Sequence, residues 1–256
     1  MGSAKRYMEQ MQAEEDMNDW IRDQVDFGVE PGDPEWEEQK IMYLSGGASE
    51  SEWELDDYGY EIDRLTADEL AFEQFIGQMH SLRDELPEAP SESSLKMTYS
   101  YSVTLMETCL GDMIKSLVLS EHHYLKNSIE NVTELKNIKI SLVDIFRNSD
   151  IIKKVVLKTF SDYLYHNIEK IVPVYSAVLG EKTPDNIKSR MNGVIMIAKN
   201  RHDIVHRNGV DKDGKAVELS RLVLVKAMDD ILDFVTHLKV SIDTARYNNL
   251  LGESEF

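Results

Sequence analysis

The spacing of apolar residues is the feature that most constrains how this chain can fold. In three long stretches, apolar side chains recur every three or four residues, which places them on one face of an α-helix. These stretches cover residues 103–117, 152–171 and 224–242. Alternation of the strand type is scarce, and the whole sequence contains only six prolines. The pattern therefore predicts an all-α protein.

Further helices are predicted between and after these stretches. Two short ones fit residues 124–135 and 137–147, and another begins with Thr183 as its N-cap and ends near residue 206, before Asn208 and Gly209. Helices of this length, joined by short connections and each with one apolar face, pack as an up-and-down bundle. We expect such a bundle in residues 91–250.

The acidic charge of the chain is confined to its first part. The net charge is −19, and residues 1–90 alone hold 25 acidic and 6 basic residues, so the remainder is neutral. The proline- and serine-rich residues 86–94 have the composition of a linker at the same place. The sequence therefore predicts an acidic, mostly helical extension, residues 1–90, with helices at 4–25, at 35–44 and from the capping box at Thr66 to residue 86.

Composition excludes several classes of protein. Cys109 is the only cysteine, so a disulfide framework or a cysteine-type zinc site cannot form within one chain, and we expect a small buried side chain there. No apolar run approaches the eighteen or so residues of a membrane span. The first residues carry no apolar stretch of the secretory type. We expect a soluble cytoplasmic protein that has no contact with membranes.

One segment carries residues suited to chemistry. The predicted helix before residue 206 has an apolar stripe at Val194, Ile197, Ala198 and Val205, and Arg201 falls on the same face. A guanidinium directed toward a packed face is unfavourable unless it is paired or has a task. His202 and His206 are four residues apart and lie one above the other, and with Arg201 they span an arc of about 140° at 100° per residue.

The segment resembles the motif of a known family. Arg201 is followed by the polar His202, three further residues and His206, and the string continues as Arg207-Asn208-Gly209 and then Asp-Lys-Asp-Gly. This arrangement is similar to the Arg-x4-His motif of HEPN domains (higher eukaryotes and prokaryotes nucleotide-binding) from bacterial toxin and anti-phage defence systems. The resemblance covers roughly residues 95–247. It implies a HEPN-like helical bundle that cleaves RNA without a metal or any other cofactor, as a homodimer in which both motifs face one cleft.

The chemistry of RNA cleavage by the 2′-hydroxyl needs these residue types. A base removes the hydroxyl proton and an acid protonates the leaving oxygen, and histidine can serve either role near neutral pH. An arginine can hold the charge that gathers on the phosphorus oxygens. We assign His206 as general base or acid, Arg201 as phosphate binder and transition-state stabiliser, and His202 as the residue that orients them. Arg207 and Asn208 are expected to contact the RNA backbone.

The sequence departs from the family at one position. Some members carry, two residues after the motif histidine, a tyrosine whose modification silences the toxin, and here that position is Asn208. Control by that route is therefore not expected. Instead we expect the acidic residues 1–90 to regulate the enzyme, by covering the cleft or by binding an inhibitory or sensing partner protein.

Two other interpretations fit the same residues. His202 and His206 have the His-x3-His spacing of zinc-binding helices, with Asp203 in the place of the catalytic glutamate and His166, His237 or a carboxylate as third ligand. This would make the chain a metal-dependent hydrolase. Alternatively, Arg201 and the histidines form a buried polar network in a HEPN-like bundle that only dimerises or serves as a scaffold.

Overall fold

The computed structural model describes residues 67–253, residues 29–44 and isolated positions between 14 and 25. The chain forms two compact units, Met1–Glu54 and Leu55–Phe256, which are considered separately below. The described residues are helical or in connecting turns, with one isolated β-bridge between Val210 and Ala216 and no strand. The all-α prediction is therefore confirmed for this part of the chain.

The first unit contains the helix α2, Pro34–Leu44. Its Trp36 is buried together with Ile21 and Val25, and these three form a small apolar cluster of their own. The helix expected at 35–44 is thus present. Most of the helix expected at 4–25, and all of residues 48–63, lie outside the described residues.

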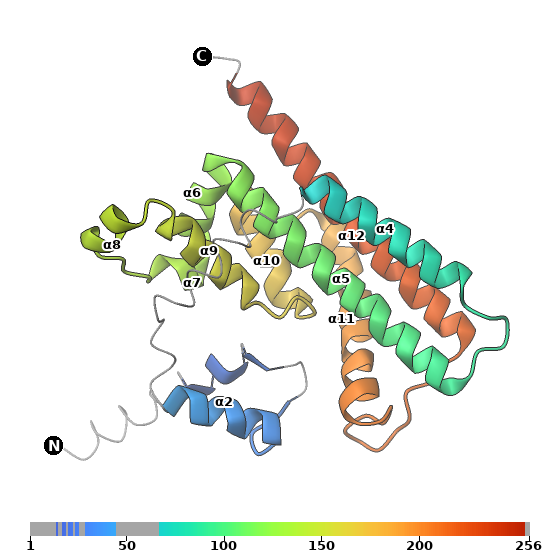
Figure 1. Cartoon of the computed structure of the whole chain (residues 1–256). Coiled ribbons are helices and arrows are strands. Elements are labelled where there is room, and N and C mark those ends of the chain that lie inside the picture. Colours follow the sequence, from blue (N-terminus) through green and yellow to red (C-terminus); the bar gives the residue numbers. More distant parts are fainter. Residues whose placement is uncertain are drawn as a thin grey trace. The chain divides into compact units, whose positions relative to one another are not determined.

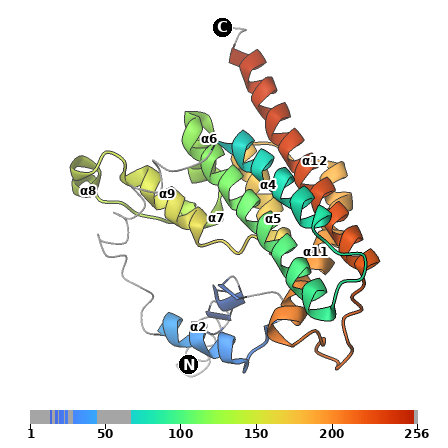
Figure 2. The same cartoon turned by 45° about the vertical axis from the view of Figure 1, so that its right-hand side comes forward.

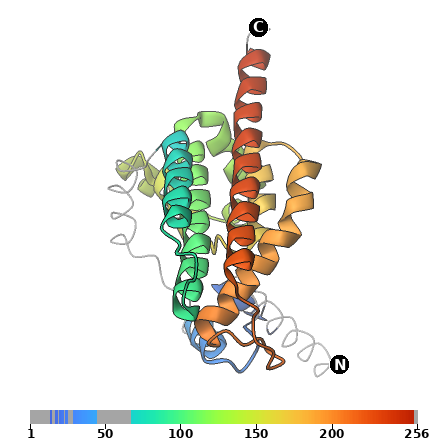
Figure 3. The same ribbon diagram turned by 90° about the vertical axis from the view of Figure 1, so that its right-hand side faces the viewer.

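The second unit is built on four long helices that lie side by side (Figures 1 and 3). They are α4, Asp68–Asp84; α5, Glu92–Ser120; α11, Asp185–His206; and α12, Arg221–Glu253. α5 packs against the other three, and most of the apolar side chains along it are buried. The side chain of Ser91 caps its first turn by accepting from the N–H of Ser94 at 3.2 Å.

Five shorter helices occupy the other side of α5 (Figure 2). They are α6, His122–Asn131; α7, Thr133–Lys136; α8, Leu142–Arg147; α9, Ile151–Ser161; and α10, Ile168–Leu179. The side chain of Asn167 caps the start of α10, and Gly180 ends it in the left-handed conformation that glycine adopts at low cost. α6 and α7 together lie where one short helix was expected at 124–135, and α8 lies within the one expected at 137–147.

The single helix expected over residues 152–171 is wrong, because the structure breaks it into α9 and α10. The break follows from local capping. The hydroxyl of Tyr165 donates to the carbonyl oxygen of Phe160 at 2.5 Å, near the end of α9, and Asn167 begins the next helix. Apolar residues on both sides of the break face the same core, so their spacing does not reveal the turn between them.

The helix α4 belongs to the same core as the helices that follow it. Ala71, Phe75 and Met79 are buried against α5 and α12. Of the linker expected at residues 86–94, the part before residue 92 lies in a turn between two packed helices, and the last three residues already belong to α5. A proline-rich turn has the same composition whether it joins two domains or two neighbouring helices. The acidic side chains lie on the exposed face of a helix, so they do not indicate which residues its buried face contacts.

None of the helices that the structure describes combines the length and the apolar character needed to span a lipid bilayer.

Candidate functional site

The motif lies in the last two turns of α11. This helix begins after Pro184, which occupies the N-cap position that the sequence analysis gave to Thr183. The hydroxyl of Thr183 instead lies 2.6 Å from that of Ser176. The helix ends at His206 as expected, so Arg201, His202 and His206 all project from regular helical backbone.

The buried face of α11 changes direction near the motif. Val194, Ile197 and Ala198 are buried, as expected, but Val205 is 48% exposed and Ile204 is buried in its place. The expected apolar stripe is therefore wrong in its last member. Arg201 is half-buried, between the packed stretch at Ala198 and the exposed Val205.

The two motif histidines are neighbours with different surroundings. Their ring centroids are 4.8 Å apart and the rings are tilted by 35°. His202 is buried, whereas His206 is exposed. The exposed imidazole can meet a substrate, and the buried one can hold its orientation.

Asp203 anchors the end of the helix from inside. Its side chain is buried and receives a hydrogen bond from Arg207 Nη1 at 3.2 Å. Its carbonyl oxygen accepts the N–H of Gly209 at 2.8 Å, which closes the last turn. Arg207 was expected to contact RNA, but its guanidinium already pairs with a buried carboxylate, which limits its reach.

The turn after the helix rests on a residue that the sequence analysis missed. Lys96, in the first turns of α5, donates from Nζ to the carbonyl oxygen of Asn208 at 3.1 Å and pairs with Glu92 at 2.8 Å. Asn208 and Gly209 both have positive φ, 55° and 85°. A Cβ atom on Gly209 would lie 3.1 Å from Lys96 Cε, so glycine permits this close approach. No pattern in the sequence pairs residue 96 with residue 208.

A second residue of α5 also reaches α11 beside the motif. Tyr99 is buried and its hydroxyl lies 3.5 Å from the side-chain amide of Asn200. Burial raises the pKa of Tyr99 to about 12, so the phenol stays neutral and acts as a hydrogen-bonding group. The helix before Arg201 is therefore held by the neutral hydroxyl of Tyr99. The turn after His206 is held by the positively charged Lys96.

The geometry bears on the zinc interpretation. Among residues 67–253, no third histidine, cysteine or carboxylate joins His202 and His206 in a group that could hold a metal. Nδ1 of His166 lies 2.8 Å from Glu107 and His237 pairs with Asp233 at 3.2 Å, so neither expected ligand joins the motif. Asp203, which was expected in the place of the catalytic glutamate, is buried and pairs with Arg207.

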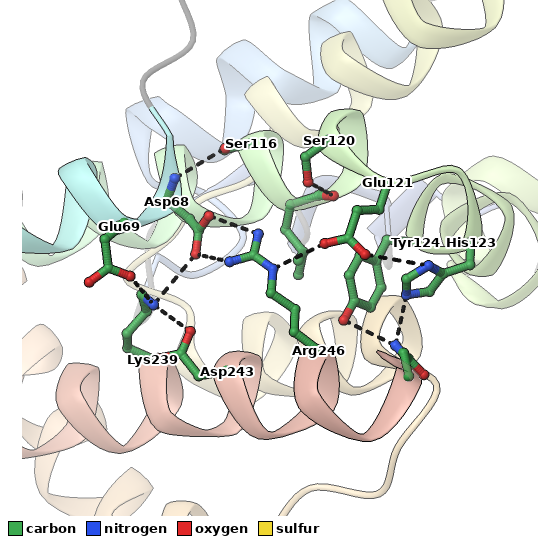
Figure 4. Close-up of polar contacts among 12 residues, drawn as sticks. Asp68, Glu69, Ser116, Ser120, Glu121, His123, Tyr124, Lys239, Asp243 and Arg246 are labelled. Carbon is green, nitrogen blue, oxygen red and sulfur yellow. Dashed lines mark hydrogen bonds and ion pairs between the residues drawn. The ribbon is translucent and has the colours of Figure 1, made fainter. Parts of the chain in front are cut away.

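A buried ion network lies elsewhere, where α4 begins against α12 (Figure 4). Arg246 donates two hydrogen bonds to the buried Asp68, at 2.7 and 2.8 Å, and a third to Glu121 at 3.1 Å. The N–H of Asp68 donates to the hydroxyl of Ser116 at 3.1 Å. This bond satisfies the first N–H group of α4, and the N-cap residue Ala67 makes no side-chain bond. The network joins helices far apart in sequence, so a single sequence gives no signal for it.

This network includes three carboxylates with the spacing of a metal site. Asp68, Glu69 and Asp243 bring ligand atoms within 4.8 Å of one another. The ammonium group of Lys239 lies among them, 2.7 Å from Glu69 and 2.5 Å from Asp243. The lysine already supplies the positive charge, so the residues present do not fit a metal ion there. The network is structural.

The comparisons with known proteins add no relative. Neither the family models, nor the characterised proteins, nor the solved structures contain a match to this chain.

Proposed function

We propose that this chain is a metal-independent endoribonuclease of the HEPN type, acting as a toxin or anti-phage defence effector. The observation that carries the proposal is the end of α11, where the half-buried Arg201, the buried His202 and the exposed His206 lie within two turns of one helix and the two imidazole rings are neighbours. An all-α unit with long packed helices is consistent with the up-and-down HEPN-like bundle that the motif implies.

Each residue has a role that its surroundings support. His206 is exposed and can exchange a proton with the 2′-hydroxyl or with the leaving oxygen of RNA. Arg201 can hold the phosphate and its developing charge through two parallel hydrogen bonds. His202 lies against the His206 ring and orients it. No step needs a metal or another cofactor.

A single chain supplies one histidine of the acid–base pair. We therefore propose a homodimer in which two copies of the motif face one cleft, so that one His206 acts as base and the other as acid. The exposed side chain of Val205 lies on the surface that would meet the second copy. Asn208 is exposed beside it and is retained as an RNA contact, whereas the role of Arg207 is reduced by its pairing with Asp203.

The test is RNA cleavage in the presence of a chelator. We expect the full chain to cleave single-stranded RNA, and we expect Arg201→Ala and His206→Ala to lower the rate by about 100-fold or more, because each removes a group that acts in the transition state. His80→Ala, on the exposed face of α4, is the matched control and should cleave at the wild-type rate. Equal cleavage by all four proteins would exclude the assignment.

The burial of His202 and Asp203 favours a second candidate, a HEPN-like module that dimerises or serves as a scaffold without catalysis. Its expected result in the same experiment is a dimer that leaves RNA intact. The lesser alternative, a metal-dependent hydrolase, requires activity that appears only when zinc is added.

The acidic first part is proposed as the regulatory region. Residues 1–90 would bind an inhibitory or sensing partner protein, and their excess of carboxylates would repel RNA from any surface they cover. Since α4 packs in the bundle core, this role belongs to the residues that precede it.

A further inference from the structure

The segment around α8 exposes an unusual amount of apolar surface. We call residues 136–152 the α8 arm. Within it, Leu142 is 83% exposed, Phe146 is 92% exposed, and no residue of α8 is buried. Four more large apolar side chains of the arm are exposed, those of Ile138, Val143, Ile145 and Ile152. A six-residue helix is not stable in water by itself, and an apolar patch of this kind marks an interaction surface.

The arm also carries three cations that are unpaired among the described residues, whereas of its two acidic residues Asp150 pairs with Lys153 and Asp144 accepts from the Ser141 hydroxyl. The side chains of Lys136, Lys139 and Arg147 are exposed, and none of them forms an ion pair with any other residue that the structure describes. The surface that the arm fits must therefore offer apolar contact with carboxylates near it.

Such a surface exists on the outer side of α4 and α5. An open groove of about 400 Å³ runs between the two helices, lined by Leu82 and Tyr101, by Gly77, and by the polar side chains of Gln74, Gln78, Ser81 and Glu85. Gly77 lies in this groove, and no atom comes within 4 Å of the place where its Cβ would be, so the absence of a side chain leaves the space open. We call it the α4/α5 groove.

Carboxylates accompany the groove. Glu85 lines it, and Glu73 and Asp84 are exposed on the same helix. Within residues 67–253 these three side chains form no ion pair, as is also true of the three cations near the arm. The two surfaces therefore complement each other in charge, and Leu82 and Tyr101 offer apolar contact within the groove.

The arm cannot reach the groove of its own chain. α8 packs against α9, and Figures 1 and 2 show it projecting from the side of the unit away from α4. We propose that the α8 arm of one copy docks into the α4/α5 groove of a second copy, with Phe146 and Leu142 in the groove and the cations beside Glu73, Asp84 and Glu85. When two copies exchange arms around a two-fold axis, the contact forms twice and the assembly closes.

The composition of the arm favours a protein surface over RNA. Five of its six exposed apolar side chains are aliphatic, whereas single-stranded nucleic acid is held mainly by stacking on aromatic rings. The proposal does not depend on RNA cleavage, because neither surface includes a residue of the Arg201–His206 motif.

The association of the full chain tests the contact by charge exchange. One variant reverses the arm, with Lys136→Glu, Lys139→Glu and Arg147→Glu. The other reverses the groove, with Glu73→Lys, Asp84→Lys and Glu85→Lys. We expect each variant alone to associate at least ten-fold more weakly than the wild type in sedimentation equilibrium. An equimolar mixture should recover the association, because each arm then meets a groove of opposite charge. A mixture that associates no better than its components would overturn the proposal.

A matched pair of leucines tests the apolar part. Leu142→Glu places a charge on the arm, and Leu222→Glu does the same at the start of α12, where the leucine is 80% exposed. We expect weaker association for the first variant alone, with unchanged helical circular dichroism for both. If both variants associate like the wild type, or if Leu142→Glu lowers the melting temperature at unchanged mass, the arm is not an intermolecular contact of this kind.

Discussion

At the residue scale, the sequence predicted the motif at the end of α11, but it did not predict the residues that hold the motif in place. The spacing of Arg201, His202 and His206 placed them correctly on one helix end, since helical geometry alone decides that. The burial of Asp203 and the bond from Lys96 to the Asn208 carbonyl depend on which helices become neighbours. A single sequence holds no record of contacts across more than a hundred residues.

Lys96 should stabilise the turn after α11. Its ammonium lies at the negative end of the helix and donates to a carbonyl, so Lys96→Met, which keeps the apolar stem, should lower the free energy of unfolding by about 1 kcal/mol. Lys126→Met is the matched control, because among the described residues the Lys126 ammonium makes a single, exposed pair, with Glu130 at 3.9 Å. Urea denaturation of both variants measures the difference. Identical midpoints would mean that the bond to Asn208 contributes nothing.

At the element scale, the periodicity located the helices well but misjudged two features. It joined α9 and α10 into one helix, since both bury the same face, and it placed Val205 in the buried stripe of α11. The spacing of apolar residues indicates which face of a helix is buried. It does not indicate where local capping interrupts the helix, as between Phe160 and Asn167, or where the buried face shifts, as at Val205.

Two glycines within helices separate the effect of side-chain packing from the effect of helix propensity. A Cβ on Gly111 in α5 would lie 3.0 Å from the Tyr165 ring, which is fixed by its bond to Phe160, whereas a Cβ on Gly193 in α11 would meet nothing within 4 Å. Gly193→Ala should therefore stabilise the protein by about 1 kcal/mol through helix propensity. Gly111→Ala should destabilise it by about 1 kcal/mol, because overpacking exceeds that gain. Thermal unfolding of the two variants gives the signs, and shifts in the same direction would contradict the packing argument.

At the scale of the whole molecule, the all-α class followed from the sequence, but the extent of the bundle did not. The step in charge near residue 90 suggested a boundary there, yet Ala71, Phe75 and Met79 lie in the main core and the second compact unit begins at Leu55. The acidic side chains of α4 lie on its exposed face. The apolar side chains on its buried face determine which helices it packs against.

Truncation tests this assignment. A chain that begins at residue 91 lacks α4, and therefore exposes the faces of α5 and α12 that Phe75 and Met79 cover. Each buried side chain of that size contributes roughly 2 kcal/mol, so we expect this chain to be less stable by about 5 kcal/mol or more than one that begins at residue 55. Circular dichroism during thermal unfolding compares the two. Equal melting temperatures would show that α4 is dispensable to the bundle.

The ion network at the start of α4 also has a mechanical consequence. Ala67 leads directly into Asp68, and a pull on the chain ahead of it acts first on the bonds to Arg246 and Ser116. These bonds hold the first residue of α4 to α12 and α5 together, so tension is shared by three helices before any one of them unwinds. The start of α4 is thus a mechanical anchor held to both α5 and α12, and we expect a pull on the preceding chain to break these bonds before α4 unwinds.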